Sequence, residues 1–213
     1  MVDLRELYDA ILKGNSADAV TITRQALGES LDPMHIVHEG MMPAMEEAGR
    51  RFEAFEFFIP ELLVAASAMK QAMTLIRPLL ADREGDYTRK VIIGTVKGDL
   101  HDIGKNLVAS MLEGGGFEVR DLGVDVPPAQ FVEQINTGNV DIVAMSALLT
   151  TTVGYMRETV AAIEEAGLRD RVKIMVGGPP VSQAFADEIG ADGYRDNANA
   201  AVSLARELVQ SGH

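Results

Sequence analysis

The chain has 213 residues, enough for one large domain or two small ones, and 47% of them are hydrophobic. It contains no cysteine, which excludes disulfides, cysteine-ligated zinc and thiol nucleophiles. A formal net charge of −13, with no tryptophan and only 5% aromatic residues, argues against a surface that binds nucleic acid.

The first residues do not have the pattern of a secretory signal. Acidic residues occupy the positions where a signal peptide carries a basic flank, and charged residues interrupt every long apolar run. We therefore expect a cytoplasmic protein that does not associate with a membrane.

Residues 1–83 show helical periodicity only. Apolar residues recur at helical spacing in four stretches, opened by Leu4, by Asn15 or Ser16, by Asp32-Pro33, and by Pro60. Pro43 lies inside the third stretch, where a proline kinks or interrupts a helix. Short connections between four helices predict an N-terminal four-helix bundle that forms a cap domain. The polar residues 84–89 then form a linker.

From residue 90 to residue 213, short apolar runs alternate with helical segments. The expected strands are residues 91–94, 118–122, 141–145, 172–176 and 191–194. The expected helices are residues 103–113, 128–137, 153–166, 181–189 and 198–210. Five strand–helix units of this kind predict an α/β domain, with a doubly wound, five-stranded parallel sheet of flavodoxin-like order 2-1-3-4-5.

This topology brings three loops together at the carboxyl edge of the sheet. In the expected order, the first and third strands are neighbours, and ligands bind where their loops diverge. These loops are residues 95–102 and 146–152, with residues 177–180 of the fourth strand's loop close by. We expect the functional site at this edge.

The first of these loops carries an imidazole two residues after a carboxylate, His101 after Asp99. A histidine that binds a metal usually donates its other ring N–H to such a group, and Gly98 and Gly104 leave room for a large ligand. Alone, the pair is more often a solvated or locally hydrogen-bonded one than a metal site. One histidine cannot hold a bare metal ion, so any cobalt would take most of its ligands from a macrocycle.

The residues around the pair resemble a known signature. The segment Gly98-Asp99-Leu100-His101-Asp102-Ile103-Gly104-Lys105-Asn106 is similar to the loop of cobalamin-binding domains of the methionine synthase type. Ser146 to Thr152 and Gly177-Gly178 match that family on the other two loops, and Phe58-Ile59-Pro60-Glu61-Leu62-Leu63 resembles its helical cap. The resemblance covers almost the whole chain. It points to the small corrinoid proteins of methanol, methylamine and methoxyarene methyltransferase systems.

The resemblance implies a role for each matching residue. His101 would replace the corrinoid's own base as cobalt ligand, Asp99 would hold His101, and Thr152 would hydrogen-bond Asp99; these three are the catalytic candidates. Ser146, Thr150, Gly177 and Gly178 would line a slot for the displaced nucleotide tail. The full implied cofactor-binding set is Gly98, Asp99, His101, Asp102, Ile103, Gly104, Ser146, Leu148, Thr150, Thr152, Gly177 and Gly178, with Phe58, Leu62 and Met69 from the cap.

The cap would shield the upper face of the cofactor from water and oxidants. Phe58, Leu62, Ala65 and Met69 are the candidates for an apolar lid, which has to move to let partners reach the methyl group. The alternative is that they form the bundle core, and for Leu62 and Met69 this is nearly as good an interpretation.

The implied function is that of a corrinoid methyl carrier in one-carbon metabolism. Co(I) would accept a methyl group from a substrate methyltransferase, and methyl-Co(III) would deliver it to a second methyltransferase acting on tetrahydrofolate or a thiol coenzyme. A reductive activase is a further candidate partner. Three alternatives stay open: the cobalamin-binding subunit of a radical mutase, a cobalamin-dependent sensor, and a flavodoxin-like interaction module without cofactor. Whether the chain is itself an enzyme is left open.

A second group of side chains invites a metal interpretation. His35 and His38 lie three apart on an expected helix, with Glu39 beside them, so a zinc site is conceivable. Structural or surface histidines are the more common explanation of such a pair. The acidic excess similarly fits a solvated surface better than a docking face for partner enzymes.

Overall fold

The computed structural model describes residues 2–80 and 89–210. These divide into two compact units, Met1–Thr88 with Glu113–Phe117, and Arg89–Leu112 with Glu118–His213. Each unit is described by itself. Residues 84–88 of the expected linker lie outside the described part of the chain.

The helical unit begins with helices whose caps are readable in the sequence. Its elements are α1 (Leu4–Leu12), α2 (Ser16–Gly28), α3 (Pro33–Ile36), the π-helical segment η1 (Val37–Met41), α4 (Met42–Glu53) and α5 (Ile59–Leu80). The side chains of Asp3, Asn15 and Asp32 each accept a hydrogen bond from a backbone N–H in the first turn that follows. Such caps satisfy donors that a helix start leaves without partners.

The third helical stretch is interrupted next to Pro43, as its sequence predicts. The interruption takes the form of η1, in which the amide of Met42 donates to the carbonyl of Val37, five residues back. Pro43 has no N–H to continue an α-helical ladder, and a wide π turn lets the helix continue past that missing donor.

Helix α5 is the apolar centre of the helical unit. It contacts α1, α2 and α4, and its residues Leu62, Ala65, Met69, Met73 and Ile76 are buried. By length and composition alone, Ile59–Leu79 is able to cross a membrane, although charged residues were expected to interrupt every long apolar run. The core helix of a folded domain also meets these criteria, and α5 packs against its neighbours as such a helix does.

The second unit is built on a parallel sheet. Its strands are β1 (Lys90–Thr95), β2 (Glu118–Asp121), β3 (Ile142–Ser146), β4 (Lys173–Gly177) and β5 (Gly193–Tyr194). Over residues 89–210 these strands form one five-stranded sheet of order β2-β1-β3-β4-β5, which confirms the flavodoxin-like topology.

Strand β5 is shorter than residues 191–194, the range expected for it. Gly193 and Tyr194 pair with Met175 and Val176 of β4, and before them the amide of Asp192 donates to the carbonyl of Ile174 at 2.7 Å. The amide of Ala191 donates instead to the carbonyl of Ala186 at 2.9 Å, which closes the end of the preceding helix. That donor is therefore not free to extend the ladder.

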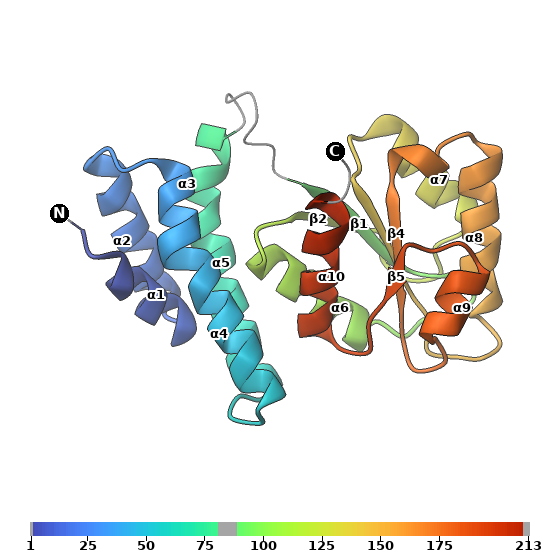
Figure 1. Cartoon of the computed structure of the whole chain (residues 1–213), viewed down its shortest axis with the longest axis horizontal. Coiled ribbons are helices and arrows are strands. Elements are labelled where there is room, and N and C mark those ends of the chain that lie inside the picture. The colour runs from blue at the N-terminus through green and yellow to red at the C-terminus, as the bar shows by residue number, and fades with distance from the viewer. Residues whose placement is uncertain (1, 81–88, 211–213) are drawn as a thin grey trace. The chain divides into compact units, whose positions relative to one another are not determined.

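Helices cover both faces of this sheet (Figure 1). They are α6 (Ile103–Gly114), α7 (Pro128–Thr137), α8 (Gly154–Glu165), α9 (Gln183–Glu188) and α10 (Ala198–Gln210), with a 3-10 turn, η2, at Arg169–Arg171. In Figure 1, α6 and α10 lie on one side of the strands, and α7 and α8 lie on the other. The helices expected from periodicity agree with these to within two residues at each end, and the 3-10 turn was not anticipated.

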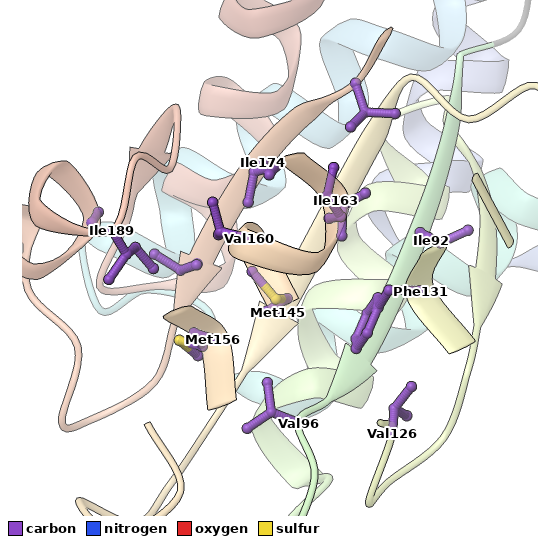
Figure 2. Packing of buried hydrophobic residues seen from close by; sticks show 14 of the residues in the cluster. Ile92, Val96, Val126, Phe131, Met145, Met156, Val160, Ile163, Ile174 and Ile189 are labelled. Carbon is purple, nitrogen blue, oxygen red and sulfur yellow. The ribbon is translucent and has the colours of Figure 1, made fainter. Parts of the chain in front are cut away.

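The core between the sheet and α7 and α8 is closely packed (Figure 2). Phe131 of α7 is fully buried there with Val96, Val126 and Met145. A Cβ on Gly94 of β1 would lie 2.9 Å from the Phe131 ring, so a glycine is required for the ring to fit. The strand that leads to the site is thus fixed by tight packing below it.

Candidate functional site

The site lies on one transverse row of the sheet. Thr95 of β1 is in register with Ser146 of β3, and Ser146 is in register with Gly177 of β4. Each of these residues ends its strand, so the three expected loops start side by side at the carboxyl edge. The loop after β1 carries both Asp99 and His101.

One oxygen of Asp99 faces His101. Asp99 is fully buried, and its Oδ1 lies 2.7 Å from Nδ1 of the His101 ring. The same oxygen accepts the backbone N–H of His101 at 3.1 Å. The Thr95 hydroxyl donates to the carbonyl of His101 at 2.9 Å. Ring and backbone of His101 are therefore both fixed.

The other oxygen of Asp99 faces the loop after β3. Oδ2 accepts the backbone N–H of Leu148 at 2.8 Å and that of Leu149 at 3.2 Å. The hydroxyl of buried Thr152 lies 2.7 Å from Oδ2, closer than the 3.0 Å to the carbonyl of Leu149. The expected hydrogen bond between Thr152 and Asp99 is present.

This environment keeps Asp99 ionised. Burial raises the pKa of its carboxyl, but hydrogen bonds from Thr152, Leu148 and His101 lower it more, and the pKa lies well below its usual 3.8. An ionised carboxylate only accepts hydrogen bonds, so Nδ1 of His101 must carry the proton. The lone pair is then on Nε2, and this is the tautomer that binds a metal through Nε2.

Apolar side chains around His101 are left open to solvent. The His101 side chain is 51% exposed, and the neighbouring Leu100 and Ile103 are 71% and 86% exposed. Leu148 and Leu149 on the adjacent loop are also exposed. Large apolar side chains gathered at one edge mark a binding surface. A flat, mostly apolar ligand with one open coordination position fits this surface.

A bare metal ion does not fit it. Among the described residues, no group of three or more His, Cys, Asp or Glu side chains is arranged to hold one. His101 would contribute a single nitrogen, so the metal must bring its remaining ligands with it. A corrin macrocycle, which supplies four nitrogens, meets this requirement.

The slot residues implied by the resemblance meet at the same edge. Ser146 is half-buried beside Gly177, and Thr150 is exposed on the following turn. A Cβ on Gly178 would lie 1.9 Å from the carbonyl oxygen of Ala147, and Gly178 has a φ of +122°. Only glycine lets the β4 loop approach the β3 loop this closely.

The remaining loop residues lie along the exposed part of the same segment. Gly98, Asp102, Ile103 and Gly104 are all exposed, and Gly98 has a φ of +78°. The carboxylate of Asp102 accepts the side-chain amide of Asn106 at 3.0 Å. They flank His101 in space as they do in sequence.

The lid candidates differ in exposure. Phe58, which precedes α5, is 63% exposed, whereas Leu62, Ala65 and Met69 are fully buried. The burial of these three residues is what is expected of side chains in the core of the helical bundle. Phe58 alone of the four presents a large apolar surface.

Three contributors were missed in the sequence. Leu149 donates through its backbone, which leaves no side-chain signal. Asp125 accepts the backbone N–H of Gly98 at 2.7 Å, and buried Lys105 pairs with Asp121 at the end of β2. Asp121 and Asp125 could have been found from the expected strand order. That order puts β2 next to β1, so the loop after β2 also lies at the site.

The histidines of the helical unit do not form a site. His35, His38 and Glu39 are all exposed, and no metal-binding group occurs in the described ranges 2–80 and 89–210. They are surface residues.

Comparison with known proteins agrees with this geometry. A family model described as "B12 binding domain" matches residues 89–203, and a second with the same description matches residues 3–77. The chain is 42% identical over 207 residues to the dimethylamine corrinoid protein of Methanosarcina barkeri, covering 97% of both chains. The chain belongs to the B12-binding corrinoid proteins. Its cofactor is cobalamin or a related corrinoid.

Two further relatives show the range of this family. The corrinoid protein is 42% identical over 203 residues to trimethylamine corrinoid protein 1 of Methanosarcina acetivorans, covering 94% of both chains. Its fold matches a chain in the crystal structure of the methanol:cobalamin methyltransferase complex MtaBC from Methanosarcina barkeri, with a TM-score of 0.82 and 26% identity. That match covers 97% of this corrinoid protein and 79% of the other chain.

Proposed function

We propose that this corrinoid protein is a methyl carrier that serves two methyltransferases in turn. The observation that carries the proposal is the pair of Asp99 and His101, in which a buried, ionised carboxylate fixes an exposed imidazole with Nε2 free. The bound corrinoid supplies the chemistry, because its cobalt can take up a methyl group and give it away. The chain supplies the ligand, the binding surface and the shielding.

His101 is the lower ligand of the cobalt in this proposal. Asp99 and Thr152 hold its ring in one orientation and one tautomer, which raises the basicity of Nε2. The ionised Asp99 would keep the ring in place whether or not Nε2 is bound to a metal. The macrocycle would be held by Gly98, Asp102, Ile103, Gly104 and Leu148.

The residues at the ends of β3 and β4 would hold the nucleotide tail of the cofactor. Ser146 and Thr150 offer hydroxyl groups, and Gly177 and Gly178 offer backbone without side chains. Phe58 is the lid residue that we favour, because it is the exposed member of the four candidates. Leu62 and Met69 support it from the core of the helical unit.

The partners follow from the role of a carrier. One methyltransferase activates the methyl donor, and a second passes the methyl group to tetrahydrofolate or a thiol coenzyme. The similarity to a chain of a methanol:cobalamin methyltransferase complex supports the first of them. Relatives named for dimethylamine and for trimethylamine are equally similar, so the donor is set by the partner methyltransferase. A reductive activase is a further proposed partner. The proposed location is the cytoplasm, which cell fractionation tests.

The other functions considered from the sequence receive less support. A radical-mutase subunit or a sensor would share the loop around His101 but not the whole chain. Similarity to dimethylamine and trimethylamine corrinoid proteins extends over at least 94% of this chain, including the helical unit. That extent favours the carrier.

Reconstitution with hydroxocobalamin tests the ligand. We expect the wild type to bind the cofactor and His101→Ala to change the visible spectrum of its Co(II) and methylated forms. His35→Ala removes an exposed histidine of the helical unit and is the matched control, with a spectrum like that of the wild type. An unchanged spectrum in His101→Ala would show that another group binds the cobalt.

A further inference from the structure

The turn after β2 contains an aspartate in an unusual conformation. Asp125 is exposed and has a φ of +54°, in the left-handed region that few residues other than glycine adopt. It lies on Gly123-Val124-Asp125, which the implied cofactor-binding set does not include. A strained, exposed residue of this kind calls for an explanation in what its side chain and backbone contact.

Asp125 holds the backbone on both sides of the Gly98–Asp99 peptide. Its Oδ1 accepts the N–H of Gly98 at 2.7 Å, and its own N–H donates to the carbonyl of Asp99 at 3.0 Å. Gly98 has a φ of +78° and no side chain, and the next amide, that of Asp99, donates to the carbonyl of Val96 at 3.1 Å. The two hydrogen bonds of Asp125 add to this one and limit how the Asp99 backbone can turn.

The turn that carries Asp125 is itself anchored. Asp121, just before it, pairs with the buried amine of Lys105 in the first turn of α6, and its Oδ1 accepts the N–H of Gly123 at 2.8 Å. At the other end, Val126 donates to the carbonyl of Thr95 at 3.0 Å. The turn is thus fixed both to the helix that follows His101 and to the strand that precedes it.

We propose that Asp125 is a positioning residue for the cobalt ligand, which acts by fixing the Gly98–Asp99 peptide and hence the Asp99 carboxylate on which His101 depends. The proposal rests on His101 being that ligand. It predicts that Asp125 affects the hydrogen bonds of Asp99 to the loop after β3, although the carboxylate of Asp125 is itself bonded to Gly98.

Two substitutions separate the acceptor from the backbone conformation. Asp125→Gly keeps the positive φ but removes the acceptor, whereas Asp125→Asn keeps an acceptor oxygen and tolerates the same φ. Asp170→Gly removes an exposed aspartate from η2, at the opposite edge of the sheet, and is the matched control. Because Asp125 is exposed, all three should fold, which circular dichroism checks.

The first readout needs no cofactor. In the apoprotein, NMR-detected hydrogen exchange follows the Leu148 amide and the Nδ1 proton of His101, both bound to Asp99. We expect Asp125→Gly to accelerate their exchange by about tenfold, the equivalent of one hydrogen bond to a charged group. Asp125→Asn and Asp170→Gly should remain within about twofold of the wild type, well below the change that losing such a hydrogen bond produces.

The second readout uses the reconstituted full chain. In the Co(II) state, electron paramagnetic resonance shows nitrogen coupling from an imidazole ligand. We expect a weaker coupling in Asp125→Gly and full coupling in Asp125→Asn. If Asp125→Gly matches the wild type in both readouts while His101→Ala loses the coupling, the positioning role is wrong and the carrier function stands. Equal behaviour of the Gly and Asn variants would also overturn it. Coupling retained in His101→Ala would overturn the ligand assignment and this inference with it.

Discussion

A single carboxylate determines what His101 can do. Asp99 accepts hydrogen bonds from two groups of His101, two amides and one hydroxyl, all in a buried position. With its lone pairs used in this way, it has no capacity to accept a proton near neutral pH. The imidazole is held with Nδ1 bonded to Asp99, which leaves Nε2 as its other ring nitrogen.

Acid should weaken the folded protein through this residue. The pKa of folded Asp99 lies below the ordinary 3.8, so its ionised form stabilises the fold at pH values above 3.8, and this contribution declines as the pH falls below it. We expect urea unfolding of the wild type to show this decline. Asp99→Asn should lack that part of the pH dependence while being less stable at neutral pH.

Thr152→Val should have a pH dependence of stability between those of the wild type and Asp99→Asn. It removes the hydroxyl donor but keeps the carboxylate, so it should lose part of the acid sensitivity. Equal slopes for the wild type and Asp99→Asn between about pH 4 and pH 2, the range in which a salt-bridged or hydrogen-bonded aspartate titrates, would contradict the assignment.

The sequence could predict the side chains of this group but not its backbone donors. Asp99, His101 and Thr152 have the right chemistry and fall on loops that the topology brings together. The amides of Leu148 and Leu149 point at Asp99 because of the local turn after β3, which residue type does not specify. Asp125 was missed because its carboxylate accepts a backbone N–H, that of Gly98, and residue type does not show such a partner.

At the scale of elements, the end of α4 has a similar unusual residue. Phe55 has a φ of +58° and is 83% exposed. The amide of Glu56 donates to the carbonyl of Arg51 at 2.8 Å, which is the six-to-one hydrogen bond of a Schellman motif. In this motif Phe55 occupies the left-handed position where glycine is usual. A phenylalanine here is strained and gains little from burial.

Replacing Phe55 by glycine should stabilise the helical unit. A left-handed conformation costs a side chain about 1–2 kcal/mol, and the extra entropy of an unfolded glycine offsets about half of that. We expect Phe55→Gly to raise the free energy of unfolding by roughly 0.5–1 kcal/mol in urea titrations. Glu56→Gly, one residue on and without a positive φ, should lower it. A loss of stability in Phe55→Gly would mean that the ring makes contacts worth more than the strain.

Element boundaries were predictable where the chain carries caps or prolines. Asp3, Asn15 and Asp32 start helices as their residue types suggest, and Pro43 marks an interruption. The π form of that interruption was not predictable, because it depends on which carbonyl the Met42 amide reaches. The short β5 also depended on a competing hydrogen bond, from Ala191.

At the scale of the whole molecule, strand order followed from the alternation of strands and helices. Parallel strands with right-handed crossovers leave few arrangements, and the order that puts β1 beside β3 brings the chemically distinctive loops together.

Cofactor binding should stabilise the α/β unit by mass action. A ligand that binds only the folded state at a hundredfold its Kd raises the free energy of unfolding by about 2.7 kcal/mol. We expect thermal unfolding of the reconstituted protein to shift upward with hydroxocobalamin concentration. His101→Ala should show a smaller shift at equal concentration. A melting temperature that does not depend on concentration would contradict specific binding at this site.

The two oxygens of Asp99 belong to different loops. Oδ1 is bonded to the ring and backbone of His101, and Oδ2 is bonded to Leu148, Leu149 and Thr152 in the loop after β3. The carboxylate thus links the two loops. A displacement of the Leu148 or Leu149 amide would rotate the carboxylate and, through it, the imidazole of His101. Both leucines are exposed. Whatever presses on them would move the imidazole through Asp99 and so, with His101 as the proposed cobalt ligand, would alter the metal–nitrogen bond without touching the metal.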